Sequence, residues 1–204
     1  MTIKVLALSL TLSLALAVSG AGAESPTEAV KSVVDEVIRT LQDPSLKAPA
    51  QKKQRRDRVK QIVDRRFDYE EMAKRSLSAS WKSLSAGQRQ EFVRLFGELL
   101  EASYSDKIMN YGDEKVKYAP EIKEGDDYAE VRTMVLRKND KIPMNYRLMH
   151  KSQGWMVYDV VIEGVSLVSN YRTQFGQVIR ESSYNELVRR LKTKINEMQK
   201  IKGS

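Results

Sequence analysis

Hydrophobic residues recur every three or four positions through the first half of the chain, which is the spacing of amphipathic helices. Four stretches also begin with a capping box, in which a Ser or Asp is followed three residues later by Glu or Gln and the two side chains bond backbone N–H groups at a helix start. These boxes begin at Ser25, Asp68, Ser85 and Ser183. The pattern predicts helices over residues 25–43, 52–67, 68–76 and 85–109, and two more after residue 164.

From residue 115 the hydrophobic period changes to two, which is typical of β-strands. Strands are predicted over 115–120, 128–138, the segment with Ile142, Met144, Tyr146 and Leu148 at alternate positions, and 155–162. Turns at Asn139-Asp140 and at 152–154 would connect them. Which face of the last strand points inward stays open, because both faces are apolar apart from Asp159 and Glu163. This order predicts an α+β fold, with a twisted antiparallel sheet of about four strands packed against several helices.

The first 23 residues have the three-part layout of a secretory signal peptide, and we expect cleavage after Ala23. Lys4 precedes an apolar run from Val5 to Val18, and small residues follow. A membrane anchor is the alternative, but the run is about 14 residues long, short of the roughly 20 that span a bilayer. We therefore expect residues 1–23 to be removed and residues 24–204 to form a single exported domain.

The chain has no cysteine and a single histidine, His150, which excludes cysteine-based catalysis and most transition-metal sites. We expect His150 to be structural, because a catalytic base needs a nucleophile and an orienting group beside it. Asp159 and Glu163 could form a carboxylate pair, but four residues along a strand separate them by roughly 13 Å, too far for a glycosidase pair. We expect a salt bridge to Lys or Arg instead, and we predict no catalytic residue, metal or cofactor.

Basic residues outnumber acidic ones and give the chain a formal charge of +8, which favours anionic partners. For an exported protein, an anionic membrane, a lipid headgroup or an acidic protein fits better than nucleic acid, which we exclude as a partner. The charge could equally serve solubility alone. The basic residues that could dock the protein, or could merely form a solvated helix face, are Lys52, Lys53, Arg55, Arg56 and Arg58.

Two stretches resemble the MlaC family, also called the toluene-tolerance family. The first is Phe67 to Ala73 (FDYEEMA), followed by Trp81 and by the segment from Gln88 to Tyr104. The second is Trp155 to Arg172 (WMVYDVVIEGVSLVSNYR). Where the family usually has Leu-Gly and an aromatic residue before the Trp, this chain has Leu77 to Ser80 (LSAS), which affects the packing expected near Trp81. The resemblance covers essentially all of the chain after the signal peptide.

The resemblance implies a periplasmic carrier that holds a glycerophospholipid by its tails in an apolar cavity between sheet and helices. Such carriers exchange lipid with an inner-membrane ABC transporter, through an MlaD-like subunit, and with an MlaA-like outer-membrane lipoprotein complex. This exchange helps to keep the outer membrane asymmetric. Each buried methylene contributes about 0.8 kcal/mol, so two tails supply ample binding energy with the headgroup left in solvent.

We expect the lipid tails to contact apolar residues of the longest helix and of the strands. Those residues are Phe92, Phe96, Leu99, Tyr104, Val131, Val135, Met144, Tyr146, Leu148, Val160 and Ile162. One alternative is a carrier for hopanoid or another lipid. A second is a periplasmic enzyme that uses His150 or Asp159 in an open cleft. A third is a protein-interaction module, which would have a tightly packed interior.

Overall fold

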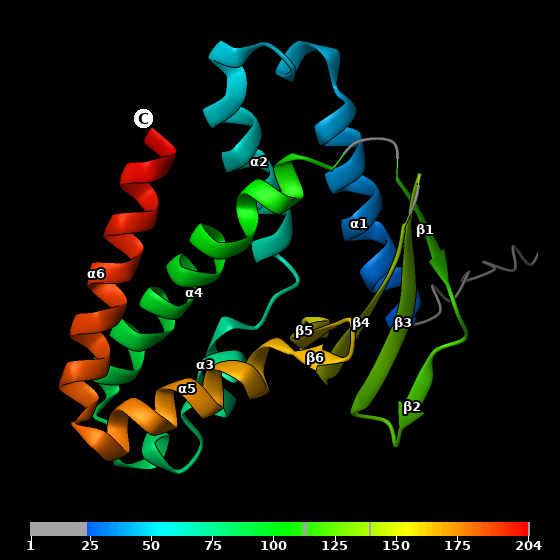
Figure 1. Ribbon diagram of the computed structural model, residues 1–204. Helices are drawn as coiled ribbons and strands as arrows, with labels where there is room; N and C mark the ends of the chain where they lie inside the picture. The colour runs from blue at the N-terminus through cyan, green and yellow to red at the C-terminus, as the bar shows by residue number, and fades with distance from the viewer. Residues whose placement is uncertain (1–23, 112–113, 139, 204) are drawn as a thin grey trace, which may run out of the picture.

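The computed structural model describes residues 24–111, 114–138 and 140–203, and the predicted signal peptide lies outside these ranges (Figure 1). The α-helices are α1 (Pro26–Gln42), α2 (Lys52–Asp64), α3 (Tyr69–Leu77), α4 (Ala86–Met109), α5 (Leu167–Glu181) and α6 (Tyr184–Gly203). Short 3₁₀ helices are η1 (Pro44–Leu46), η2 (Pro49–Gln51) and η3 (Ser78–Ser83). The strands are β1 (Lys115–Tyr118), β2 (Ile122–Glu124), β3 (Tyr128–Arg137), β4 (Asp140–Lys151), β5 (Gly154–Ile162) and β6 (Val165–Ser166).

The helix starts predicted from capping boxes are confirmed. At Ser25 and Ser85 the box is complete, because each hydroxyl accepts a backbone N–H and the Glu or Gln three residues later accepts the N–H of the cap. Asp68 caps α3 and Ser183 caps α6 with a single bond each, in which the side-chain oxygen accepts the backbone N–H three residues later. These caps satisfy N–H groups that the first turn of a helix leaves unpaired.

Helix α2 ends at Asp64, before its predicted end, because residues 66–68 pair with β5 instead. The Val157 N–H donates to the Arg66 carbonyl at 2.7 Å, and the Asp68 N–H donates to the Val157 carbonyl at 2.9 Å. This short parallel bridge covers part of the free edge of β5, where unpaired backbone groups would otherwise be exposed. It also sets the point at which α3 begins.

The strands form one antiparallel sheet in the order β1-β3-β4-β5-β6, with β2 paired to the beginning of β3. The prediction of about four strands missed β2 and β6, which are three and two residues long and too short to show a period. Asn139 of the predicted turn lies outside the described residues, whereas Asp140 pairs with Arg137 as the first residue of β4. At the next hairpin Lys151 pairs with Gly154, so Gly154 opens β5 at a φ of 97° that glycine adopts readily.

A β-bulge at Tyr158 decides which side chains of β5 point inward. Arg147 of β4 pairs with Asp159, and Leu148 pairs with Val157, so Tyr158 has no partner across the ladder. The extra residue shifts the alternation by one position. Because of this shift, inward-pointing residues before and after Tyr158 do not follow one strict alternation. The sequence pattern therefore could not decide which face of β5 points inward. The residues that share the inner face are Trp155, Val157, Val160 and Ile162.

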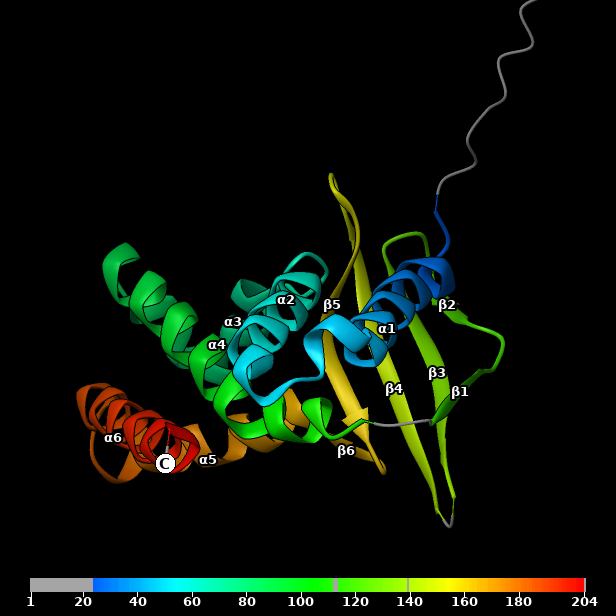
Figure 2. The same cartoon turned by 90° about the horizontal axis from the view of Figure 1, so that it is seen from above.

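Apolar side chains gather in two clusters. The helical core lies between α3, α4, α5 and α6, where the rings of Phe92 and Phe96 each meet Phe175 edge to face, at centroid distances of 5.6 and 5.7 Å. The inner sheet cluster lies between the sheet and α1, and Figure 2 shows α1 against the sheet with α5 and α6 on the far side of β5. The inner sheet cluster consists of Ala29, Val30, Ala129, Val131, Leu148, Trp155, Val157 and Val160.

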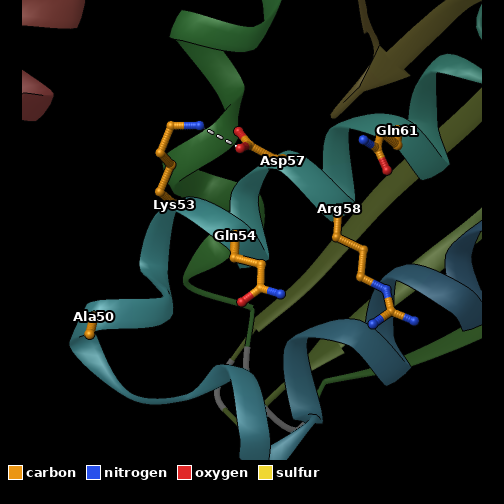
Figure 3. Close-up of a pocket in the computed structure, with 6 residues that line it drawn as sticks. All are labelled: Ala50, Lys53, Gln54, Asp57, Arg58 and Gln61. Atoms are coloured by element: carbon orange, nitrogen blue, oxygen red, sulfur yellow. Dashed lines mark hydrogen bonds and ion pairs between the residues drawn. The ribbon is translucent and has the colours of Figure 1, made fainter.

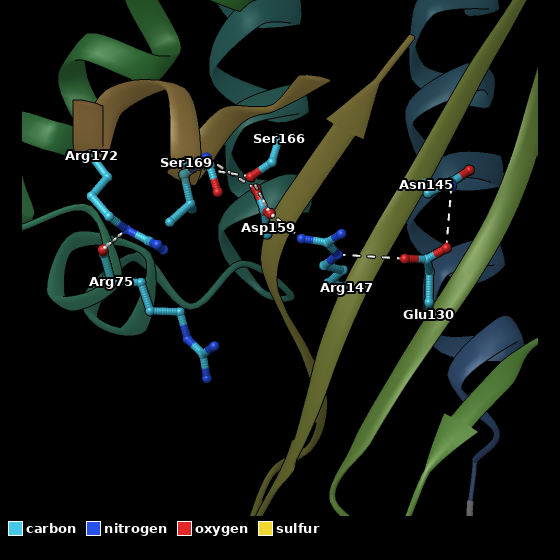
Figure 4. A network of polar contacts seen from close by, with 9 residues as sticks. Arg75, Glu130, Asn145, Arg147, Asp159, Ser166, Ser169 and Arg172 are labelled. Carbon is cyan, nitrogen blue, oxygen red and sulfur yellow. Dashed lines mark hydrogen bonds and ion pairs between the residues drawn. The ribbon is translucent and has the colours of Figure 1, made fainter. Parts of the chain in front are cut away.

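A buried carboxylate joins the sheet to α5 (Figure 4). Asp159 is 2% exposed and accepts hydrogen bonds from the Ser166 hydroxyl at 2.6 Å and from the Val168 N–H at 3.0 Å. Its Oδ2 also lies 3.3 Å from Nη1 of Arg147, which confirms the predicted salt bridge. Glu163 lies in the exposed turn after β5 and forms no pair with Asp159 among the contacts described. Asp159 therefore links strand β5 to the first turn of α5.

Candidate functional site

Most of the strand residues predicted to contact lipid lie together on the inner face of the sheet. The register places Tyr146 between Val131 of β3 and Val160 of β5. Val135 is the exception, because it is buried farther along β3 and outside this cluster. The residues brought together are the buried Val131, Leu148 and Val160 and the partly buried Met144, Tyr146 and Ile162.

The residues predicted on the long helix lie in the other apolar cluster, and their contact with lipid stays a prediction. Phe92, Phe96 and Leu99 are buried in the helical core, and Tyr104 packs against it. The Phe96 ring meets that of Tyr171 edge to face at a centroid distance of 5.2 Å. Helical periodicity showed that this stripe of α4 is buried, but the stripe packs on α5 and α6 and not on the sheet.

The apolar surface between α1 and the sheet is only partly covered by the protein's own side chains. Ala29 and Val30 at the start of α1 are buried, whereas the next apolar residues of the same stripe keep accessible surface. An amphipathic helix packed on a sheet normally buries this stripe at high packing density. The partly covered residues that pack against the inner sheet cluster are Val34 on α1, and Tyr118, Met144, Tyr146 and Ile162 on the sheet. Val33, Val37 and Ile38 of α1 are also only partly buried.

Two tyrosines add hydroxyl groups to this surface. Burial raises the pKa of the Tyr146 hydroxyl far above its ordinary value, although the side chain keeps accessible surface. The Tyr146 hydroxyl donates to Sδ of Met144 at 3.1 Å. The Tyr118 hydroxyl is buried and has no hydrogen-bond partner within the described ranges.

Sequence reasoning missed several residues that pack against the inner sheet cluster. The helical stripe of α1 contained the signal for Val34, but nothing in the sequence says that α1 faces the sheet. Tyr118 lies in a strand of four residues, and Leu167 lies at the start of a helix, so neither shows a usable period. The pairing of β1 with β3 places Tyr118 beside the cluster, and the turn after β5 places Leu167 there.

A separate pocket of about 520 Å³ lies along α2 (Figure 3). Nζ of Lys53 and Oδ2 of Asp57, one helical turn apart in its lining, form an ion pair at 2.6 Å. Burying an acyl tail against such groups would remove their hydration, so this pocket does not suit lipid tails. Its lining consists of Ala50, Lys53, Gln54, Asp57, Arg58 and Gln61.

The groups that an enzyme would use are engaged elsewhere or isolated. His150 is exposed, and its ring contacts only the Trp155 ring in the described aromatic contacts, at a centroid distance of 4.9 Å. Within the described ranges, no three acidic or histidine side chains are grouped so that they could hold a metal ion. None of the helices described is long and apolar enough to cross a bilayer.

The model of the MlaC protein family matches residues 31–193, from α1 into α6. This chain belongs to the MlaC family. A curated MlaC relative, the intermembrane phospholipid transport system binding protein of Haemophilus influenzae, is 29% identical over 120 residues. That match covers 56% of this chain and 56% of the relative, so it spans about half the length of either MlaC protein.

The fold of this MlaC family member is also that of a solved phospholipid-binding protein from Ralstonia solanacearum, whose structure is in complex with a phospholipid. The TM-score is 0.76 at 27% sequence identity. The alignment covers 85% of this chain and 98% of the Ralstonia chain. Both relatives place the MlaC family among phospholipid-binding and phospholipid-transport proteins.

Proposed function

We propose that this MlaC family member is a periplasmic phospholipid carrier. It would shuttle glycerophospholipid between an MlaA-like outer-membrane complex and an inner-membrane ABC transporter with an MlaD-like subunit, and so maintain the asymmetry of the outer membrane. Residues 1–23 would serve as the signal peptide and residues 24–204 as one lipid-binding domain. The observation that carries the proposal is the partly covered apolar surface between α1 and the inner face of the sheet.

Acyl tails suit this surface because both of its sides are mostly apolar, with hydroxyl groups only at Tyr118 and Tyr146 among the residues of the inner sheet cluster and those packed against it. Each methylene moved out of water contributes about 0.8 kcal/mol, so ten methylenes in contact contribute about 8 kcal/mol before the entropy cost of association. The residues of the inner sheet cluster are all apolar, so a tail entering beside them displaces water from no charged group. The phospholipid in the Ralstonia structure supports the same class of ligand.

Binding without catalysis is the role we infer. The Asp159 carboxylate is used to hold Ser166, Val168 and Arg147 together at the start of α5. His150 stands beside an aromatic ring, where no nucleophile is described within reach. A general base in either position would lack the neighbouring groups that make it useful.

Native mass spectrometry of the protein purified from periplasm tests the proposal. We expect an adduct with the mass of a glycerophospholipid, and fragmentation of the released ligand should yield a phosphate-containing headgroup and two fatty acids. An adduct of hopanoid mass would favour the alternative carrier. The proposal would be contradicted by protein that is ligand-free and that also fails to take labelled phospholipid from donor vesicles.

A further inference from the structure

Two arginines lie on the buried face of α2. Arg55 and Arg56 precede Val59 by four and three residues, which places them about one helical turn from Val59 on the same side of the helix. Val59 and Ile62 are the buried apolar residues of that side. The side chains of Arg55 and Arg56 are themselves partly buried, unlike the exposed Arg58 two positions later.

The guanidinium groups of this pair are incompletely bonded. Nε of Arg55 and Nε of Arg56 are both buried without a hydrogen-bond partner in the part of the chain that the structure describes. Nη2 of Arg56 bonds Oδ1 of Asp106 on α4 at 3.1 Å, and no such contact of Arg55 is described. Buried N–H groups in native proteins nearly always have an acceptor, and guanidinium groups have no acceptor capacity of their own. An acceptor from outside the chain is therefore expected here.

The arginine pair lies beside the end of α4, from which the chain leads through Tyr111 into β1. Asp106, the partner of Arg56, lies near the end of α4, and its carbonyl accepts the N–H of the residue just before Tyr111. Burial is the main cause of the raised pKa of the Tyr118 hydroxyl, and Tyr146, the Asp35 carboxylate of α1 and Tyr111 lie close enough to raise that pKa further. The end of α4 also lies beside α2 in both overall views (Figures 1 and 2).

We propose that Arg55 and Arg56 form a phosphate-binding subsite at this end of the lipid site, occupied by the phosphodiester of the bound phospholipid. This rests on the proposed function. A guanidinium group matches the oxygens of a phosphate with two parallel N–H donors, and its charge strengthens both bonds. The tails would lie along the inner sheet face, and the headgroup would not be left wholly in solvent, contrary to the expectation from the sequence.

The test uses residues 24–204 stripped of lipid, with two probes that have the same tails. Dioleoylphosphatidylglycerol has the phosphodiester, and dioleoylglycerol lacks it. We expect the wild-type protein to bind the phospholipid at least about tenfold more tightly, the scale of one charged hydrogen bond. Arg55→Gln should remove most of that preference and leave the affinity for dioleoylglycerol unchanged. Arg58→Gln, on the exposed side of the same helix, is the matched control and should keep the preference.

Arg55→Lys and inorganic phosphate complete the test. Lys keeps the charge but lacks the planar pair of donors, so an intermediate preference is expected, and this variant also serves if Arg55→Gln does not fold. Equal binding of both lipids by the wild-type protein would overturn the subsite and leave the carrier intact. Binding of neither lipid would overturn the proposed function itself. Binding of inorganic phosphate by calorimetry without any preference between the lipids would assign the arginines to free phosphate and overturn the headgroup assignment.

Discussion

Leu148 has no exposed surface and packs where β3, β4 and β5 meet below α1. Leu148→Glu should leave the protein largely free of phospholipid, because a carboxylate without a partner in an apolar site costs several kcal/mol. Phosphate analysis of the purified protein measures the bound lipid. Leu148→Met is the volume-conserving control and should retain lipid. Ile162→Glu repeats the test at a partly buried position if Leu148→Glu does not fold. Folded variants with the wild-type lipid content would show that these residues do not line the site.

Asp159 stabilises the fold by joining strand β5 to the start of α5. Asp159→Ala should lower the free energy of unfolding by about 2–4 kcal/mol, because two bonds from Ser166 and Val168 to a buried carboxylate are lost. Arg147 adds less, since it is 41% exposed and its charge is screened by solvent. Urea unfolding followed by circular dichroism measures the change. Glu163→Ala, in the exposed turn, should stay within about 0.5 kcal/mol of wild type. Equal stabilities of the two variants would refute this role of Asp159.

At the scale of elements, the two clusters separate stability from binding. Phe96→Ala should destabilise the protein by about 3–5 kcal/mol, because Phe96 fills the helical core between α4 and α5. The lipid bound per folded molecule should not change, since Phe96 is outside the inner sheet cluster. Tyr146→Ala should reduce the bound lipid and should lower the free energy of unfolding less than Phe96→Ala does. A Phe96 variant that folds but loses its lipid would show that α4 contributes to the lipid site.

The elements themselves were predictable where a period could be counted. The capping boxes at Ser25 and Ser85 and the long stripe of α4 identified helices correctly, and the alternation in β3 and β4 identified strands. The two-residue strand β6 and the bulge at Tyr158 were not predictable, because both depend on pairing with residues distant in the sequence. The same limit applies to Phe92, since a buried stripe does not reveal which element covers it, and the structure places Phe92 against α5.

At the scale of the whole molecule, the charge predicts how the carrier meets membranes. The formal charge is +8 for the full chain, and removal of Lys4 with the leader leaves +7. Transfer of lipid to anionic vesicles should slow several-fold between about 50 and 300 mM salt, as the screening length shortens from about 14 to 6 Å. Transfer to neutral vesicles of phosphatidylcholine, followed by fluorescence, is the control and should change little. Salt-independent transfer to both would show that the charge serves solubility.

The order of the α-helices and of the longer strands, the fold class, the resemblance to the MlaC family and the presence of a single histidine could all be determined from the sequence. Each depends on local spacing or composition, which a linear chain displays directly. The tertiary structure alone decided that α4 faces α5 and α6 while α1 faces the sheet, and that Tyr158 shifts the face of β5. It also decided that the Arg55 Nε is buried with no acceptor among the residues that the structure describes. These features arise from contacts between segments far apart in the chain, and periodicity identifies a buried face without identifying what packs against it.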